Sequence, residues 1–476
     1  MLEKKLGLVG YTARYFLSFA RGLEAASFEV YWIVALRSDA LRLRRQGIPP
    51  HRILDTSPAA YERLTPEQCA ETLATLEQLD GPRVRDVILM DRMLRRRPHD
   101  FALRYLAGVA KMVGQFLEQQ DIRVISSGRD TALQMITMLV CRRNGRLWVV
   151  PTRTRLPRDR YGFMTTHECS TYVRLHEVTE AHRSAARQCL EDFRGRRLVP
   201  AARFSARGFG DVLRRVPMHL RLFGWALADA VYDRGNAFSR YTLPDLVRMW
   251  LRRRRNLIGL KVTRPYDAIG TRPYLLYALH TQPESSIDVA GSFFADQLAL
   301  VGQIARATPV THDLFVKAHP SDIDGKPGSF YRALRRIPGV RLIHPLVDSR
   351  ELLSRASLVL TVTGTIAYEA GLLGIPAVTF APLYFNALPS VRHCDSPREL
   401  PALINSLLQM PRPPGDDRPI IDFLAQLYAD SVPGEFNRIE VPLTHEDLGT
   451  LCSVYEHLLS MRFDAMEEGD ALVGRR

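Results

Sequence analysis

Short apolar segments alternate with longer amphipathic segments in the first part of the chain. The short segments have the length of buried strands, and apolar residues recur at helical spacing in the long ones. This alternation predicts a parallel sheet with helices on both faces, and we assign it to an α/β domain over residues 1–169. The predicted strands are 6–11, 28–35, 123–127 and 147–151, and the predicted helices are 13–26, 101–120 and 130–143.

The same alternation returns, more regularly, in residues 269–412, where five strands and the helices between them predict a second doubly wound sheet. Prolines then interrupt the pattern, and residues 413–476 are predicted to hold two helices, 420–430 and 445–459, and a frayed tail after residue 463. The five strands are 274–279, 314–318, 340–343, 358–362 and 377–380, and the helices are 293–307, 330–336, 350–356, 366–373 and 398–408.

Residues 170–268, between the two domains, lack strand patterns and are predicted to be a basic helical insert or linker. Apolar residues recur at helical spacing in 216–228 and 243–251, and four consecutive arginines follow at 252–255. One interpretation is a solvated helix that links the domains. The other is a surface helix that rests on an anionic membrane, to which each arginine adds about 1 kcal/mol.

The charge balance favours an anionic partner. Lysine and arginine exceed aspartate and glutamate by 65 − 51 = 14, which suits a nucleic acid, an anionic membrane face or phosphorylated small molecules. No zinc finger, helix-turn-helix or ribonucleoprotein motif accompanies the basic clusters, so a nucleic acid is not expected. The six cysteines are scattered without zinc-site spacing, and neither a signal peptide nor an apolar run long enough to span a membrane is found. We predict a cytoplasmic protein.

Candidate chemistry follows the second set of strands. Ligands bind outside the carboxyl ends of the strands of an open parallel sheet, so the loops after the strands matter most. The loop after 274–279 holds Gln282 and Glu284, with Asp288 one helical turn beyond. The other two candidate loops hold Lys317, His319 and Pro320, and Thr363, Gly364, Thr365 and then Glu369.

The Thr363–Thr365 loop predicts a phosphate site. Gly364 lets the backbone approach a ligand, and N–H groups at a helix start attract anions. Glu369, one turn into the helix, could accept hydrogen bonds from ribose hydroxyls. The alternatives are that Thr365 is a plain N-cap and that Glu369 is only a favourable acid near the helix start.

The remaining candidates are acids and a histidine. Glu284 and Asp288 could act as general base and electrostatic stabiliser in a glycosyl transfer, or could simply be acids at a helix N-terminus. His319, which precedes Pro320 and lies near Lys317, could neutralise a departing phosphate as a cation. The alternative for His319 is an ordinary structural histidine.

These motifs resemble a known family. The sequences LHTQPE, KAHP, PGVRLIHP, DSRELL and TGTIAYEAGLLGIPAVTF, within residues 274–386, are similar to the C-terminal half of bacterial capsule polysaccharide glycosyltransferases that include the Kdo transferases. The resemblance implies a GT-B fold, two Rossmann-like domains that face each other across a cleft. It also implies that Gln282, Glu284 and His319 line the donor site, with 363–365 on the donor phosphate and Glu369 near the ribose.

The resemblance leaves alternatives open. Gly-Thr followed by Glu-Ala and Gly-x-Pro also occurs in UDP-N-acetylglucosamine 2-epimerases, whose first loop has His-Arg and Glu-Asn where this chain has His280 and Glu284 without the Arg or Asn. A nucleotide-sugar epimerase and a non-catalytic polysaccharide-export partner are therefore the rival hypotheses. The motifs do not distinguish CMP-Kdo from a UDP or GDP sugar as donor.

In a GT-B enzyme the N-terminal domain would hold the acceptor, a glycan or glycolipid. Four arginines within residues 153–160 could bind an anionic acceptor, or could form a solvated basic loop. No Asp-x-Asp motif ends a strand, since Asp322-Ile323-Asp324 follows the His-Pro loop, and we expect a metal-independent glycosyltransferase of surface polysaccharide synthesis without a cofactor. The acceptor-side candidates are Gly10, Tyr11, Thr12, Arg129, Arg153, Arg155 and Arg158.

Overall fold

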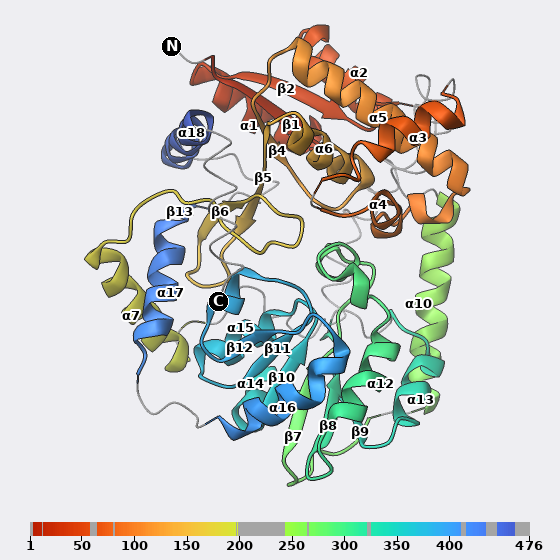
Figure 1. Cartoon of the computed structure of the whole chain (residues 1–476), viewed down its shortest axis with the longest axis vertical. Helices are drawn as coiled ribbons and strands as arrows, with labels where there is room; N and C mark the ends of the chain where they lie inside the picture. Colours follow the sequence, from red (N-terminus) through yellow and green to blue (C-terminus); the bar gives the residue numbers. More distant parts are fainter. Residues whose placement is uncertain are drawn as a thin grey trace.

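The chain forms two α/β domains that face each other (Figure 1). The computed structural model describes residues 3–11, 13–57, 64–79, 81–196, 198, 243–263, 266–320, 325–410, 416–434 and 445–461. The predicted helix 216–228, the tail after 463, Thr12 and Asp322–Asp324 lie outside the described residues. Each domain is built on one mainly or wholly parallel sheet, so the predicted doubly wound fold class, of GT-B type, is confirmed.

The N-terminal sheet has the order β13-β6-β5-β4-β1-β2-β3, in which β6 and β13 are antiparallel to their neighbours. Its strands are nearly continuous buried runs, as expected for a sheet covered on both faces. The strands are β1 Lys5–Val9, β2 Glu29–Val34, β3 Ile53–Asp55, β4 Val124–Ser127, β5 Leu147–Arg153, β6 Arg160–Met164 and β13 Val432–Pro433. The helices are α1 Ala13–Ala25, α2 Arg37–Arg45, α3 Pro66–Ala74, α4 Val84–Met90, α5 His99–Gln119 and α6 Ala132–Arg143, with short 3₁₀ turns η1 Pro50–Arg52 and η3 Leu94–Arg96.

The C-terminal sheet is wholly parallel, in the order β12-β11-β10-β7-β8-β9. Numbered within this domain, the order is 3-2-1-4-5-6, that of the nucleotide-binding Rossmann fold. Its strands are β7 Tyr274–Ala278, β8 Asp313–Lys317, β9 Val340–Ile343, β10 Leu358–Thr361, β11 Ala377–Thr379 and β12 Val391–His393. Its helices are α11 Ser285–Asp288, α12 Gln297–Ala307, α13 Gly328–Arg335, α14 Ser349–Arg355, α15 Thr365–Leu372 and α16 Leu400–Gln409, with η4 Ser292–Phe294, η6 Tyr384–Ala387 and η7 Pro397–Glu399.

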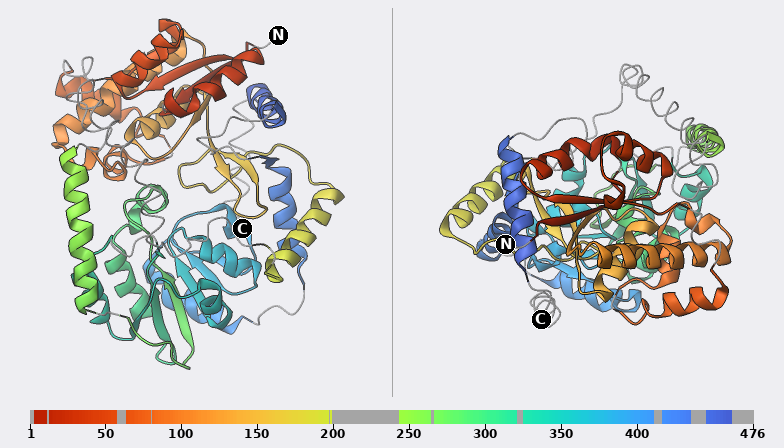
Figure 2. Two further views of the ribbon diagram at one scale, coloured as in Figure 1. Left: turned by 180° about the vertical axis from the view of Figure 1, so that it is seen from behind. Right: turned by 90° about the horizontal axis from the view of Figure 1, so that it is seen from above.

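Four further helices bridge or recross the domains (Figure 2). α7 (Glu180–Arg194) packs against α17 (Arg418–Ala429) and buries Phe193 in a cluster shared with the C-terminal sheet. α10 (Leu243–Thr263) packs on α13. The chain then returns to the first domain, where α18 (His445–Ser460) places Tyr455 in the N-terminal core and its hydroxyl donates to Ser126 Oγ at 2.9 Å.

The described residues contain six cysteines, all buried and none in a disulfide. No helix in the described ranges is long and apolar enough to cross a membrane. The same ranges contain no group of three or more His, Cys, Asp or Glu side chains that could hold a metal ion.

Candidate functional site

The topology places the predicted loops at one point of the C-terminal sheet. Strand order reverses between β7 and β10, so the loops after these two strands meet at the topological switch point, where ligands bind in open α/β sheets. The loop after β8, which carries His319, leaves the adjacent strand. In the N-terminal sheet the corresponding reversal lies between β1 and β4, whose following loops carry Gly10 and Arg129.

His280 joins the loops after β7 and β10. Its Nε2 accepts a hydrogen bond from Thr363 N–H at 3.1 Å and lies 3.1 Å from Thr361 Oγ1. Because Nε2 accepts, the ring proton is assigned to Nδ1. Burial, followed by the charges of His319 and Lys326, lowers the pKa of His280 to about 3, so the ring is neutral at pH 7. His280 therefore sets the spacing of the two loops.

His280 should also make the protein sensitive to acid. Because its pKa is about 3 in the folded state and 6.5 in the unfolded chain, below pH 6.5 only the unfolded state gains a proton. The stability that neutral His280 contributes is complete above pH 6.5 and is lost as the pH falls towards 3. At pH 5 the loss is about 2 kcal/mol, since one pKa unit corresponds to about 1.4 kcal/mol.

Urea unfolding at pH 7 and pH 5 measures this effect. The stability advantage of the wild type over His280→Gln should shrink by about 2 kcal/mol at pH 5. Asp430, whose pKa burial raises to about 6, titrates in both proteins and cancels from the difference. If the wild type exceeds His280→Gln in stability by the same amount at both pH values, the lowered pKa of His280 is contradicted.

Gln282 is held inside the loop. Its Nε2 donates to the carbonyl of Ala295 at 3.0 Å, and its Oε1 accepts from Gln297 Nε2 at 2.8 Å. Gln297, which is buried, also bonds both backbone groups of His280. The amide of Gln282 is therefore used to shape the loop, and its predicted direct contact with the donor finds no support in this geometry.

Asp288 is likewise a structural residue in this arrangement. It is 5% exposed, its Oδ2 accepts from Glu284 N–H at 3.1 Å, and its Oδ1 lies 3.8 Å from Arg95 NH1 of the N-terminal domain. A carboxylate engaged in this way orients the backbone of Glu284. The geometry therefore favours Glu284 over Asp288 for the predicted general base.

Glu284 is the exposed acid of this loop and faces positive charge from the other domain. Desolvation raises the pKa of its carboxyl, and the nearby Ser286 side chain and then the charges of Arg155, Arg92 and Arg129 partly oppose that rise. All three arginines belong to the N-terminal domain, although they come from separate segments of it. The structure thus brings the first predicted loop of one domain towards two predicted arginines of the other.

The loop before α15 was predicted to offer unpaired N–H groups to a phosphate, but its first two N–H groups are bonded within the protein. Thr363 N–H donates to His280 and Gly364 N–H donates to Thr361 Oγ1 at 3.2 Å, so neither is unpaired. Within the described part of the chain, the N–H groups of Thr365 and Ile366 have no protein acceptor. A Cβ on Gly364 would lie 2.5 Å from Thr361 Oγ1, which explains the glycine. The N–H groups that could meet an anion here are therefore those of Thr365 and Ile366, one residue further along the chain than predicted, and the phosphate site itself stays a prediction.

The two basic residues at the end of β8 and in the loop after it differ in exposure, because Lys317 is buried and His319 is exposed. Lys317 is buried and its Nζ donates to the carbonyl of Pro345 at 2.9 Å. Burial lowers its pKa to about 8. His319 and the adjoining Pro320 lie beyond it, with the histidine exposed. Desolvation and then the charge of Lys317 lower the pKa of His319, which favours the neutral ring at pH 7. The predicted cationic role at a donor phosphate stays a prediction.

The acceptor-side candidates also separate. Tyr11 is buried in the N-terminal core with its hydroxyl 3.3 Å from Ser126 Oγ, so its side chain does not form an acceptor surface. Gly10 has a positive φ of 71°, and a Cβ there would lie 2.5 Å from Gln134 Nε2. Arg129 donates to the carbonyl of His167 at 2.8 Å.

The 153–160 cluster is divided in the same way. Arg155 is exposed and its charge acts on Glu284, whereas Arg153 is part-buried on β5. Arg158 is exposed in the turn between β5 and β6. Arg160 turns away and donates to the carbonyl of Tyr428 at 3.0 Å. Of this cluster, Arg155 is the arginine whose charge lowers the pKa of Glu284.

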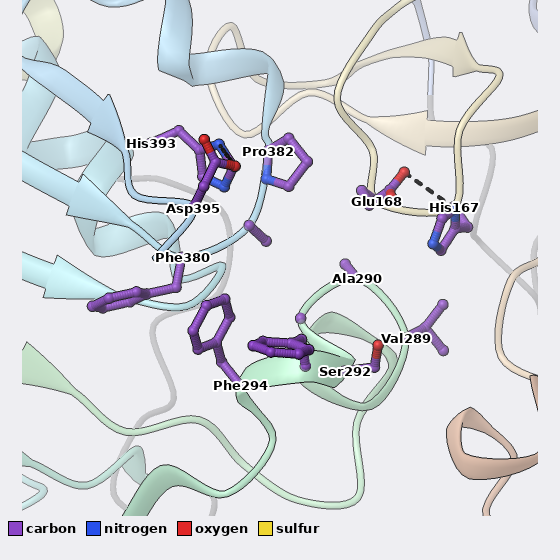
Figure 3. Close-up of a pocket in the computed structure, with 13 residues that line it drawn as sticks. His167, Glu168, Val289, Ala290, Ser292, Phe294, Phe380, Pro382, His393 and Asp395 are labelled. Carbon is purple, nitrogen blue, oxygen red and sulfur yellow. Dashed lines mark ion pairs between the residues drawn. The ribbon is translucent and has the colours of Figure 1, made fainter. Parts of the chain in front are cut away.

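A cavity of about 330 Å³ lies between the domains (Figure 3). Its volume is at the lower end of the range for small-molecule sites. One wall carries His167 of the N-terminal domain, whose Nδ1 lies 3.1 Å from Glu168 Oε2. Burial lowers the pKa of His167 to about 3, so at pH 7 this is a contact between a neutral ring and a carboxylate. The other walls come from the C-terminal domain, including Phe293, which is 87% exposed, and residues after β11 and β12. The lining residues are His167, Glu168, Val289–Phe294, Phe380–Pro382, His393 and Asp395.

Sequence reasoning missed several residues of this region. Arg92 and Arg95 follow α4, a helix that was not predicted. His393 is the last residue of the unpredicted strand β12, and Asp395 follows that strand. Lys326 is buried, with Nζ 3.5 Å from Gln282 Oε1. The run of arginines at 95–97 was visible as charge, but nothing in the sequence placed it opposite Asp288.

No family model and no curated protein matches the chain. Among solved structures it is similar to KpsC, a beta Kdo 2,4 transferase of Thermosulfurimonas dismutans (13% identity, 71% of this chain and 88% of that one, TM-score 0.38). It is also similar to UDP-GlcNAc 2-epimerase from Methanocaldococcus jannaschii (13% identity, 86% of this chain and 94% of that one, TM-score 0.27). A third similar structure is Acinetobacter baumannii MurG (10% identity, 95% of this chain and 99% of that one, TM-score 0.28). At these TM-scores the similarities carry no functional argument. The argument for function therefore rests on the residues of this chain.

Proposed function

We propose that this protein is a glycosyltransferase of surface polysaccharide synthesis, which moves a sugar from a nucleotide donor on the C-terminal domain to an acceptor on the N-terminal domain. The observation that carries the proposal is the position of Glu284. It follows β7 at the switch point of a Rossmann-ordered sheet and lies in the field of Arg155, Arg92 and Arg129 from the opposite domain.

The donor is proposed to bind along the β7 and β10 loops. Its phosphate accepts hydrogen bonds from the N–H groups of Thr365 and Ile366, where the helix dipole also favours negative charge. Glu369, one turn further along α15 and partly exposed, is positioned to accept from ribose hydroxyls. Neutral His319 donates a ring N–H to the same phosphate as charge develops on it.

In the proposed reaction a hydroxyl oxygen of the acceptor attacks the anomeric carbon of the donor sugar. The bond from that carbon to the phosphate oxygen breaks, and the nucleotide leaves with the bonding electrons. Glu284 takes the proton of the attacking hydroxyl. Its raised pKa makes it a stronger base than an ordinary glutamate, while the arginines keep the carboxylate form accessible.

The acceptor is proposed to be anionic. Arg155 is exposed and its charge acts on Glu284, and Arg92 and Arg129 add positive charge from two other segments of the N-terminal domain. A phosphate or carboxylate near the acceptor hydroxyl would form charge-assisted hydrogen bonds with such guanidinium groups. This electrostatic match would hold the reacting hydroxyl close to Glu284.

The donor site can be tested at a single N–H group. Proline is tolerated at the first position of a helix, and Gly364, with φ −71° and ψ 139°, already has the conformation favoured before proline. Thr365→Pro should therefore remove one phosphate donor without breaking α15. Thr365→Ala, which removes the hydroxyl and keeps the N–H, is the matched control.

The measurement is a thermal-shift panel over CMP, UDP, GDP and TDP, followed by calorimetry with the nucleotide that stabilises most. Thr365→Pro should weaken its binding about tenfold or more relative to Thr365→Ala, the effect of one charge-assisted hydrogen bond. If no nucleotide stabilises the protein, or if the two variants bind equally, the proposed donor site is wrong.

A further inference from the structure

The side of the molecule formed by α10 carries an apolar face without a protein partner in the described part of the chain. Figures 1 and 2 show this helix standing along the outer edge of the protein. Nine large hydrophobic residues are exposed among the described residues, and four of them lie on α10. These four are Val247, Trp250, Leu251 and Ile258, with exposed fractions of 57, 56, 54 and 65%.

The four residues lie on one arc of the helix. At about 100° per residue, they fall within an arc of about 100°, which is the width of an amphipathic stripe. The arc is opposite the packed face, where Asn256 is 2% exposed and donates to the carbonyl of Gly325 at 3.2 Å. The stripe therefore faces away from the protein, and α10 would be anchored on α13 while presenting it.

Arginines border the stripe. Arg248, Arg252 and Arg255 are exposed along one side of it, and Arg254 lies within it with its guanidinium carbon 5.3 Å from the centre of the Trp250 ring. The one acid in the helix, Asp245, lies 3.8 Å from Arg248 near the N-terminal end. An arginine within an apolar stripe can extend its charged end towards lipid phosphates while its methylenes stay among apolar groups.

We propose that α10 docks this protein in the plane of an anionic lipid bilayer, with Val247, Trp250, Leu251 and Ile258 inserted below the headgroups and the arginines on the lipid phosphates. Helices of this kind combine a buried apolar face with cationic residues at its border. At 21 residues α10 is about 32 Å long, so it offers an extended contact. Its arginines exclude it from crossing the bilayer core.

Other occupants fit this surface less well. A second copy of the chain would bring an equal row of arginines against the first, and like charges across an interface oppose association. A nucleic acid would pair with the arginines, but it would leave three aliphatic side chains facing its phosphates. Of these three occupants, a lipid surface is the one that matches both the charge and the apolar arc.

Flotation of the full chain with vesicles tests the proposal. Binding to vesicles of phosphatidylcholine and phosphatidylglycerol at 7:3 should be at least about tenfold tighter than to phosphatidylcholine alone, and should weaken in high salt. The double variant Trp250→Gln, Leu251→Gln should lose about tenfold or more of this binding. The variant Arg252→Gln, Arg255→Gln should lose most of the preference for the anionic lipid.

The matched control is Leu346→Gln with Val310→Gln. These residues are 54 and 93% exposed and lie outside α10, so their replacement should leave vesicle binding unchanged. Circular dichroism and the melting temperature of each variant confirm that it folds. The proposal is overturned if the wild-type protein does not bind anionic vesicles, or if the Trp250→Gln, Leu251→Gln variant binds them as tightly as the wild type does. It is also overturned if the protein self-associates and the α10 variants abolish that self-association.

Discussion

Replacing Glu284 by Gln is expected to lower the kcat of sugar transfer by about a thousandfold and to leave nucleotide affinity nearly unchanged. The amide keeps the size of the side chain but cannot take the proton of the acceptor hydroxyl, and general-base catalysis contributes about a hundredfold to ten-thousandfold. The side chain is exposed, so the melting temperature should change little. Steady-state kinetics and nucleotide calorimetry on the same preparation measure both effects.

The matched control for this variant is Asp288→Asn in the same loop. Asp288 accepts from Glu284 N–H and pairs with Arg95, so its replacement should lower stability and raise KM, while the pH dependence should remain. In the wild type, kcat/KM should fall with decreasing pH through the pKa of Glu284, which lies above 4.5, because the base must be ionised. In Glu284→Gln this fall of kcat/KM at low pH should disappear. If the fall is unchanged in the variant, another group is the base.

Replacing His319 by Ala is expected to lower kcat by about a hundredfold, the usual cost of removing one donor to developing negative charge. Because its lowered pKa favours the neutral ring at pH 7, the role that we propose for His319 is that of a hydrogen-bond donor and not of a counter-ion. His319→Gln, which keeps an N–H donor, should recover part of the loss. A cationic role would predict instead that activity rises as the pH falls below the pKa of His319.

His344 is the matched control for His319. It is an exposed histidine after the neighbouring strand β9, and its Nδ1 accepts from the N–H of Leu346 at 3.2 Å. Its replacement by Ala should leave kcat within about twofold, as expected for a surface change away from the site. Equal losses for the two variants would remove the reason to assign His319 to the donor phosphate.

The fold could be predicted from the sequence wherever strands are buried on both faces. β1, β7, β8 and β10 each contain a short run of buried apolar residues, and this pattern alone located them, although β8 begins at Asp313 and ends at Lys317. β12 was missed because only Val391 of its three residues is buried. β6 was also missed, because it starts at an arginine and contains Gly162. That glycine is required by a contact distant in sequence, since a Cβ there would lie 2.6 Å from the carbonyl oxygen of Asp430.

The sequence predicted where the candidate site lies, but it predicted the roles of the individual residues only in part. Strand ends placed Glu284, His319 and the 363–365 loop at one edge of the sheet, as observed. The sequence could not show that Gln282 and Asp288 are engaged within the protein, because their partners come from elsewhere. Gln297 lies fifteen positions later, and Arg95 belongs to the other domain. Roles that depend on such partners need the three-dimensional arrangement.

The central claim, acceptor-dependent transfer with Glu284 as the base, is tested most directly by mass spectrometry of products. CMP-Kdo and UDP and GDP sugars are each incubated with wild type and Glu284→Gln, with and without an oligosaccharide acceptor that bears a phosphate or carboxylate. The account predicts a product one sugar heavier together with free nucleotide, formed only with acceptor and only by the wild type. Epimerised donor without acceptor, or equal product from both proteins, would contradict it.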